Sequence, residues 1–474
     1  MIRVCENMLV PINKIPPEIL ALIPDFWDTR DRDKDVIALT HVCHTWREIF
    51  VSRSSLWTNF DCSDKEKTRV YFERSKSSPI NLSLDLSEGI LRRNPIFQII
   101  PHATGRLKSL FARGLTKDVE TITSHLSHPA PLLERLSICS HPPPAQYRAH
   151  ALPSALFNGD LSSLRMLRLQ FVYTGLPWRN MVNLTSFTLS DIPSGAFSTG
   201  QLLDFLESAP CLEEVDLCYA TPTTGIQGGR LVSLACLKSM VIESGVPCST
   251  LLDHLLIPAG AKLEIGGDPI SSSIEQYLPR SLDNLENFPD FAVVELCLGE
   301  GCQGMKFSGP NGQVNITLRD DRTDPIPEFL AKLDTSKIER LKIDRGHLLS
   351  RESLYEALLP MKDLRTLTLS KCKFPYTLIH ALEPRSSEVM VCPKLEELFL
   401  MPYPHKGMSR IMVGIIEMAA VRASRGKKLR TFRIFGGLDT VDLDVSELGK
   451  YVCNAEYVRW NPASILVRGR ESWV

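Results

Sequence analysis

Four residues in one short stretch carry the side chains that bind zinc most readily. They are His125, His128, Cys139 and His141. Imidazole nitrogen and thiolate sulfur are the usual ligands of Zn²⁺ in proteins. The spacing fits no common structural zinc site, and prolines surround these residues. We therefore expect no metal site here.

A second local cluster is basic and would suit phosphate groups. The cluster lies near the C-terminus and comprises Arg422, Arg425, Lys427, Lys428, Arg430 and Arg433. Nucleic-acid-binding domains usually combine such a run with an overall positive charge and interleaved aromatic residues. This chain has a formal net charge of −1, and the run holds no aromatic residue. We favour a solvated helix end and expect no nucleic-acid partner.

The sequence shows no signature of an enzyme or of a bound cofactor. It contains neither a phosphate-binding loop ending in Gly-Lys-Ser/Thr nor a His-Glu-x-x-His zinc helix. The glycine-rich piece from Gly299 to Gly304 lacks the strand, helix and lysine of a nucleotide site and is interpreted as a loop. No nucleophile–base pair emerges from the spacing of reactive residues. We predict a non-catalytic protein with no cofactor.

Composition indicates a globular protein of a reducing compartment. The chain has 474 residues, of which 43% are hydrophobic and 23% are charged. The N-terminus lacks the features of a signal peptide, and the best apolar run, 251–257, is too short to span a membrane. The 13 cysteines form no Cys-x-x-Cys pair. We expect cytoplasmic or nuclear localisation and no membrane partner.

The first 60 residues contain apolar and aromatic residues at helical spacing. Pro16 and Pro17 suit the first turn of a helix whose apolar stripe includes Ile19, and Pro24 should end it. A second helix is predicted after an Asp- and Arg-rich loop, with Asp33 or Asp35 as its N-cap. One face of that helix would carry Val36, Leu39, Val42, Cys43, Trp46 and Phe50. Such short helices have too small a core to stand alone.

These residues resemble the F-box, in the style of fungal F-box proteins. The match consists of three submotifs in order, which are Ile15-Pro16-Pro17-Glu18-Ile19-Leu20, Leu39-Thr40-His41-Val42-Cys43-His44-Thr45-Trp46-Arg47 and Leu56-Trp57. Ile15 replaces the usual leucine, and Pro24 stands where the family usually has an apolar residue. The resemblance implies docking onto the Skp-family adaptor of a cullin–RING ubiquitin ligase. It implies these adaptor-binding candidates: Ile15, Pro16, Ile19, Leu20, Ile23, Val42, Cys43, Trp46, Leu56 and Trp57.

The larger remainder of the chain repeats a leucine motif. The pattern L-x-x-L-x-L, with other apolar residues allowed, begins at Leu133, Leu164, Leu184, Leu212, Leu237, Val293, Ile338, Leu364, Leu395 and Leu429. Most copies start roughly 20–34 residues apart, near the spacing of leucine-rich repeats. Leu263 and Val314 fill the two wider gaps. The region resembles an irregular leucine-rich repeat family, because the Asn or Cys expected after the third apolar position is mostly absent. An ordinary α/β sheet domain is the alternative.

The fold class that follows is α/β, a short N-terminal helical F-box-like module followed by an irregular leucine-rich repeat solenoid. The expected divisions are a tail (1–12), the module (13–60), a connecting segment and cap (61–104) and the repeat domain (105–470). Because side chains alternate along a strand, the residues between the apolar positions would line a concave face. The target-binding candidates on it are Arg168, Glu214, Asp216, Arg340, Lys342, Glu397, Phe399 and Arg433.

The functional prediction is a substrate-recognition adaptor of a Skp–cullin–F-box type ubiquitin ligase. The N-terminal module would dock the Skp-family adaptor, and through it a cullin–RING ligase, while the repeat domain would bind an unknown target protein. Two alternatives stay open: a non-ligase leucine-rich repeat scaffold with an F-box-like cap, and an enzyme whose active site has no recognised signature. The sequence also does not separate adaptor-facing residues from those that form the module's own core.

Overall fold

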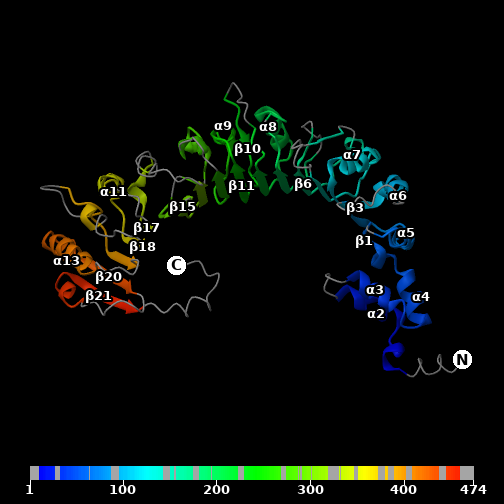
Figure 1. Cartoon of the computed structure of the whole chain (residues 1–474), viewed down its shortest axis with the longest axis horizontal. Coiled ribbons are helices and arrows are strands. Elements are labelled where there is room, and N and C mark those ends of the chain that lie inside the picture. The colour runs from blue at the N-terminus through cyan, green and yellow to red at the C-terminus, as the bar shows by residue number, and fades with distance from the viewer. Residues whose placement is uncertain are drawn as a thin grey trace. The chain divides into compact units, whose positions relative to one another are not determined.

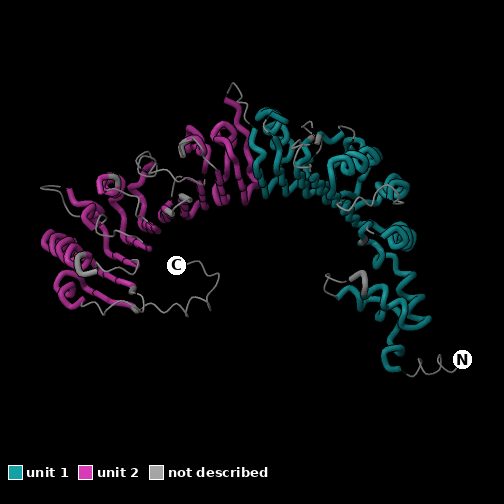
Figure 2. Tube along the Cα trace, in the orientation of Figure 1, with its two compact units in different colours: residues 1–225 teal, residues 226–474 magenta. Residues whose placement is uncertain are grey.

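A computed structural model defines a mixed α/β fold with short N-terminal helices and a large strand-rich remainder. It describes residues 10–26, 32–62, 64–86, 96–141, 150–153, 156–174, 181–193, 195–222, 229–267, 274–286, 288, 291–299, 302–318, 330, 333–345, 351–371, 379–382, 389–401, 408–436 and 445–459. The chain divides into two compact units, residues 1–225 and residues 226–474 (Figure 2). No helix in these ranges is long and apolar enough to cross a membrane.

Unit 1 begins with short helical elements. They are η1 (Pro11–Lys14), α2 (Pro17–Leu22), η2 (Ile23–Phe26), α3 (Arg32–Leu39), α4 (His44–Ser52) and η4 (Ser54–Trp57). The prediction that Pro24 ends the first helix is confirmed, because α2 stops at Leu22 and a 3₁₀ turn containing Pro24 follows.

The prediction of one continuous second helix is wrong. The chain leaves the helix after Leu39, where the amides of Thr40 and His41 donate to carbonyls only three residues back. Cys43 then takes an extended conformation (φ −158°) and caps the new helix α4. The expected N-cap is also wrong, since Asp33 and Asp35 lie inside α3. Apolar residues at helical spacing can therefore belong to two helices joined by a tight turn.

The rest of unit 1 is a row of parallel strands in chain order. Its members are β1 (Asn59–Asp61), β2 (Ile80–Asp85), β3 (Leu107–Leu115), β4 (Arg135–His141), β6 (Met166–Gln170), β8 (Ser186–Ser190) and β9 (Glu214–Cys218). The connecting elements are α5 (Lys65–Arg74), α6 (Ile96–Ala103), η6 (Thr104–Arg106), α7 (Thr116–Ser124), η7 (Leu156–Gly159) and α8 (Thr199–Ser208). A small separate sheet pairs β5 (His150–Leu152) with β7 (Val172–Thr174).

Helices α5, α6, α7 and α8 lie along one side of this strand row (Figure 1). We call the other side, which bears no helix in the described ranges, the strand face of the unit. In β6 the side chains of Leu167 and Leu169 are buried, whereas Met166 and Arg168 are exposed. The predicted alternation of buried apolar and outward polar residues is confirmed there. The segment 61–104, expected to connect and cap, contains α5, β2 and α6, and β2 joins the row.

Unit 2 also contains one principal strand row. Its order in space is β11 (Ser239–Ser244), β13 (Lys262–Gly267), β16 (Gly312–Leu318), β15 (Cys302–Gly309), β14 (Val293–Gly299), β17 (Arg340–Asp344), β18 (Thr366–Ser370), β19 (Glu397–Met401), β20 (Leu429–Gly436) and β21 (Val452–Arg459). The other elements are β10 (Val232–Ser233), α9 (Ser249–Leu252), β12 (Leu255–Leu256), η8 (Ile274–Tyr277), η9 (Leu282–Asn284), η10 (Thr335–Lys337), α11 (Arg351–Leu358), α13 (Met408–Ser424) and η11 (Glu447–Lys450).

A local reversal of strand order interrupts the row of unit 2. Strands β14, β15 and β16 form an antiparallel meander, so that β13 pairs with β16 and β14 pairs with β17. The glycine-rich piece interpreted as a loop is therefore partly strand, since Gly299 ends β14 and Gly304 lies in β15. The leucine-motif copy predicted to begin at Val293 also starts two residues too late in the sequence. The register aligns Val294 with Leu341 of β17, whereas the predicted copy would align Leu296 with Leu341.

Residues in left-handed backbone conformation follow five of the parallel strands. They have φ between 49° and 59° although none is glycine, and they are Phe171, Asp191, Tyr219, Arg345 and Lys371. Such a conformation costs an L-residue roughly 1–2 kcal/mol. At four of these positions the amide donates to a carbonyl of the neighbouring strand, for example from Asp191 N–H to the Cys218 carbonyl (2.8 Å) and from Lys371 N–H to the Met401 carbonyl (2.7 Å). At these four positions the strand ladder continues one residue past the strand.

The basic cluster near the C-terminus is not wholly solvated as predicted. Arg425, Lys427 and Lys428 are exposed, but Arg422 is completely buried in α13. Its guanidinium donates to the Val391 carbonyl (3.0 Å) and to the Cys392 carbonyl (2.8 Å).

Candidate functional site

The core of the N-terminal module is built around two tryptophans from its predicted site. Trp57 is fully buried, donates its indole N–H to the Phe50 carbonyl (2.9 Å) and packs edge-on against Tyr71 (4.9 Å between ring centroids). Trp46 is also buried, and its indole N–H donates to the side-chain oxygen of Asn13 (2.6 Å). Buried indoles with satisfied N–H groups act as structural anchors. Leu56 is buried as well.

The other predicted module residues differ in exposure. Leu20 is buried, Ile15, Ile23 and Cys43 are half-buried, and Pro16, Ile19 and Val42 are exposed. The structure therefore places four of the ten predicted residues in the module core, which are Leu20, Trp46, Leu56 and Trp57.

Large apolar side chains reach solvent throughout the module. Ile19 is 54% exposed, Val42 55% and Phe26 86%. We name as the exposed apolar set Val10, Ile12, Ile19, Leu22, Phe26, Ile37 and Val42. Water contact with so many large apolar groups in one small module is unfavourable, and exposed apolar surface of this kind marks protein-binding sites. Of this set the sequence-based site contained only Ile19 and Val42, because helical spacing does not show which side of a helix meets the core.

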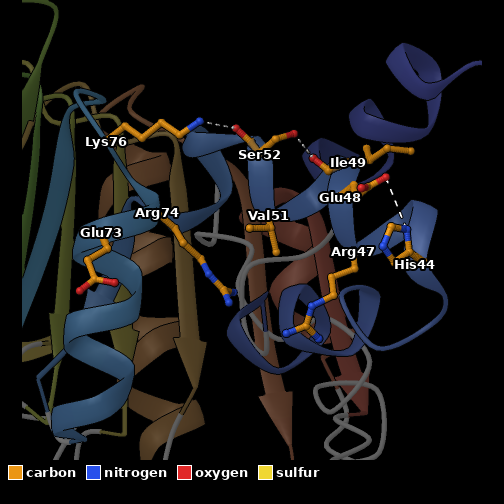
Figure 3. Close-up of a pocket in the computed structure, with 9 residues that line it drawn as sticks. All are labelled: His44, Arg47, Glu48, Ile49, Val51, Ser52, Glu73, Arg74 and Lys76. Carbon is orange, nitrogen blue, oxygen red and sulfur yellow. Dashed lines mark hydrogen bonds and ion pairs between the residues drawn. The ribbon is translucent and has the colours of Figure 1, made fainter.

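An open depression of about 940 Å³ lies between α4 and the end of α5 (Figure 3). Its lining is mostly charged, and the guanidinium of Arg74 stacks on Trp57 with 4.4 Å from its central carbon to the ring centroid. Burial lowers the pKa of Arg74, and the nearby charge of Arg47 lowers it further. Lys76 Nζ donates to the Ser52 carbonyl (3.4 Å) at the end of α4. Arg74, in the last turn of α5, and Lys76, at the end of α4, stabilise helix C-termini, where the helix dipole is negative.

Three buried cysteines of the described residues are held in the unreactive thiol form. Burial raises the pKa of the thiols of Cys62, Cys248 and Cys392 to about 12. These thiols therefore stay protonated at neutral pH, whereas the thiolate is the reactive form.

Two of the four residues considered as zinc ligands, His125 and His141, contact other groups. His125 Nδ1 lies 2.8 Å from the Thr121 carbonyl, and Arg113 donates to His141 Nε2 (2.6 Å). Cys139 is buried in β4. Across the described ranges no group of three or more His, Cys, Asp or Glu side chains could hold a metal ion.

The predicted target-binding residues lie on the strand faces, and those of unit 2 are largely paired. Lys342 Nζ lies 3.3 Å from Glu295, which Lys306 also approaches (3.7 Å). Arg433 donates to Glu456 (2.7 Å) and lies 5.9 Å from the ring centre of Phe399.

The remaining members of that predicted set have other neighbours or none. Glu397 accepts from the Thr366 hydroxyl (3.1 Å), and Glu214 accepts from the Ser186 hydroxyl (3.3 Å). Asp216 is half-buried on β9. In the described parts of the chain, Arg168 and Arg340 are exposed and have no ion-pair partner.

Comparison with known proteins identifies one segment. The F-box-like family matches residues 12–63, which include most of η1 and all of α2, η2, α3, α4 and η4. No curated protein matches the sequence. The short N-terminal helices, with their two buried tryptophans and exposed apolar set, therefore form an F-box-like domain at residues 12–63.

Proposed function

We propose that the chain is a substrate-recognition adaptor of a Skp–cullin–F-box type ubiquitin ligase. The F-box-like domain docks a Skp-family adaptor and through it a cullin–RING ligase, while the strand-rich remainder binds the protein to be modified. The chain performs no covalent chemistry and acts by bringing its target close to a partner enzyme. The proposed setting is the cytoplasm or the nucleus.

The observation that carries this proposal is the F-box-like match combined with the exposed apolar set. The match covers residues 12–63, and the set lies on or beside the same helices. Burying an exposed isoleucine or valine in an interface contributes about 1.5–3 kcal/mol per side chain.

The proposal for the strand-rich region is an irregular leucine-rich repeat solenoid of the kind found in fungal F-box proteins, with its concave face toward the target. Parallel strands in chain order, alternating burial and a recurrent left-handed residue after the strand support it. The proposed divisions are the tail (1–12), the F-box-like module (13–60), the connecting segment and cap (61–104) and the repeat domain (105–470). The reversed meander of β14 to β16 is the main irregularity.

Adaptor docking can be tested with variants that leave the core intact. Full-length chain with Ile19→Glu and Val42→Glu should lose most Skp-family adaptor in a pull-down, because both side chains are more than half exposed. The matched control is Val413→Glu in α13, where the valine is 54% exposed. Variants of Trp46 or Trp57 are unsuitable, since removing a buried tryptophan costs about 3–5 kcal/mol and unfolds the domain.

The same pull-down separates the ligase from the non-ligase scaffold. Recovery of both adaptor and cullin with the wild type supports the ligase adaptor, while adaptor without cullin supports the scaffold. If the wild type recovers neither protein, or if the Ile19 and Val42 variant binds as well as the Val413 control, adaptor docking through this surface is wrong. Circular dichroism spectra of all variants must match the wild type.

A further inference from the structure

Two arginines on neighbouring strands of unit 1 point outward without a counter-charge. Arg135 is the first residue of β4, and Arg168 is the third residue of β6. The register pairs Arg135 with Met166 and Ser137 with Arg168, so the two arginines are diagonal neighbours on the strand face. Both are exposed, and among the described residues neither has a hydrogen-bond or ion-pair partner.

The residues beside this arginine pair on the strand face of the adjoining strands are neutral. On the adjoining strands Ser109 and Phe111 of β3 stand beside Arg135 and Ser137, and Thr188 of β8 stands beside Arg168. Phe111 is 36% exposed and Met166 is 44% exposed. The acidic residues of β9 are two strands from Arg168, roughly 10 Å by strand spacing. The face therefore combines two unneutralised guanidiniums with hydroxyls and two accessible apolar groups.

The geometry of the pair suits carboxylates on an extended chain. One strand spacing and two residues of rise place the Cβ atoms of Arg135 and Arg168 roughly 8 Å apart. Side chains on one side of an extended segment repeat roughly every 6.8 Å. The arginine side chains are flexible enough to bridge the difference between the roughly 8 Å Cβ separation and the roughly 6.8 Å repeat. A guanidinium can bind each carboxylate with two parallel hydrogen bonds.

We propose that the strand face of β3, β4, β6 and β8 binds an extended acidic protein segment, with acidic side chains at alternate positions contacting Arg135 and Arg168. This inference rests on the proposed function, since it assigns the chemistry of the target that the strand-rich region recognises. Phe111 and Met166 contact apolar side chains beside the acidic ones. The segment supplies the negative charge that the described face lacks around these two arginines.

A labelled peptide titrated against the full-length chain tests this assignment. The probe is a fluorescein-labelled ten-residue peptide of alternating Glu and Thr, and the matched probe replaces each Glu with Gln. Fluorescence anisotropy in 150 mM salt should show at least tenfold tighter binding of the Glu peptide. Charge reversal by Arg135→Glu with Arg168→Glu should abolish this preference, and Arg135→Gln with Arg168→Gln should reduce it at least fivefold.

The matched control is Arg430→Glu. Arg430 is the second residue of β20 in unit 2, lies outside the predicted target-binding set, and is likewise exposed and without an ion-pair partner in the described ranges. This variant should keep the affinity of the wild type. Thermal melts followed by circular dichroism establish that each variant is folded.

Several results would overturn the assignment. Equal affinity for the Glu and Gln peptides, unchanged binding by the folded Arg135 and Arg168 variants, or an equal loss in the Arg430 variant would each do so. Competition of the Glu peptide by an equally charged single-stranded oligonucleotide at lower concentration would assign the face to nucleic acid instead. Because the titration contains no adaptor, its failure is distinguishable from failure of adaptor docking.

Discussion

Two arginines on the strands of unit 1 have no counter-charge among the described residues, whereas most of the predicted target-binding cations of unit 2 are paired. In unit 2, Lys342 and Lys306 share Glu295, Arg433 pairs with Glu456, and Arg422 is buried against main-chain carbonyls. In unit 1, Arg135 and Arg168 occupy similar positions on a strand face without any partner in the described ranges. The same residue type thus stabilises the fold at some positions, such as Arg422 and Arg433, and remains available to a ligand at others, such as Arg135 and Arg168.

This difference shows that charge on a repeated strand face is a poor guide to binding until the pairing is known. From the sequence, positions 340–342 and 433 are the basic part of the face and 214–216 the acidic part. The structure neutralises Lys342 and Arg433 internally. A paired surface charge has less free energy to offer a partner, because binding must replace an existing interaction and desolvate it.

The largest effect is expected for Arg422. Its replacement by methionine leaves the Val391 carbonyl without a donor among the described residues and the Cys392 carbonyl with only the Leu395 N–H, in the interior of unit 2. We expect a loss of about 2–4 kcal/mol in the free energy of unfolding, measured by urea denaturation with circular dichroism. Arg168→Met in unit 1 should change it by less than about 0.5 kcal/mol. Equal urea midpoints for the two variants would contradict the distinction between arginines that stabilise the fold and arginines that are free to bind a ligand.

A smaller effect, equal in both units, is expected at the left-handed residues that follow the strands. Tyr219 in unit 1 (φ 49°) and Lys371 in unit 2 (φ 51°) both have exposed side chains. Valine tolerates this conformation poorly, so Tyr219→Val and Lys371→Val should each cost about 1–2 kcal/mol of unfolding free energy. The glycine variants are the controls and should stay near the wild type. A cost confined to one unit would show that the two strand rows differ in backbone as well as in charge.

The smallest effect concerns pH. Hydrogen bonds from the Asn454 amide and the Arg433 guanidinium hold the pKa of Glu456 below its usual value. A carboxyl with a lowered pKa in the folded state contributes stability above its unfolded pKa and loses it as pH falls through the folded value. Acid unfolding of the wild type should therefore show a slightly steeper loss below about pH 4.5 than Glu456→Gln. The Arg135 and Arg168 variants should show no such difference, and a difference there would contradict their unpaired state.

The sequence predicted the repeated strands well, because leucine-type residues recur at fixed spacing. Strands β4, β6, β8 and β9 coincide with predicted motif copies. Periodicity gave no signal for β15, whose place depends on antiparallel pairing with β14 and β16. It also merged α3 and α4, since Val42 and Cys43 fit a helical stripe although they lie in the turn.

The candidate sites were predictable in location but not in role. The F-box-like resemblance found Trp46 and Trp57, yet only their contacts with Asn13 and the Phe50 carbonyl show that they form the core. Likewise, Lys342 and Glu295 are far apart in sequence, and they meet because β14 pairs with β17. A pattern of residue types therefore identifies a surface, while the pairing that decides its use depends on strand order.

The reversed order of β14, β15 and β16 has a consequence for synthesis on the ribosome. Strand β13 pairs with β16, which emerges roughly 50 residues later, and not with β14, the next strand in the chain. At translation rates of about 5–20 residues per second, its open edge waits roughly 3–10 s. An unpaired strand edge is a template for pairing with other chains. Nascent unit 2 is therefore most prone to misassembly in that interval, and a chaperone that shields strand edges would act there.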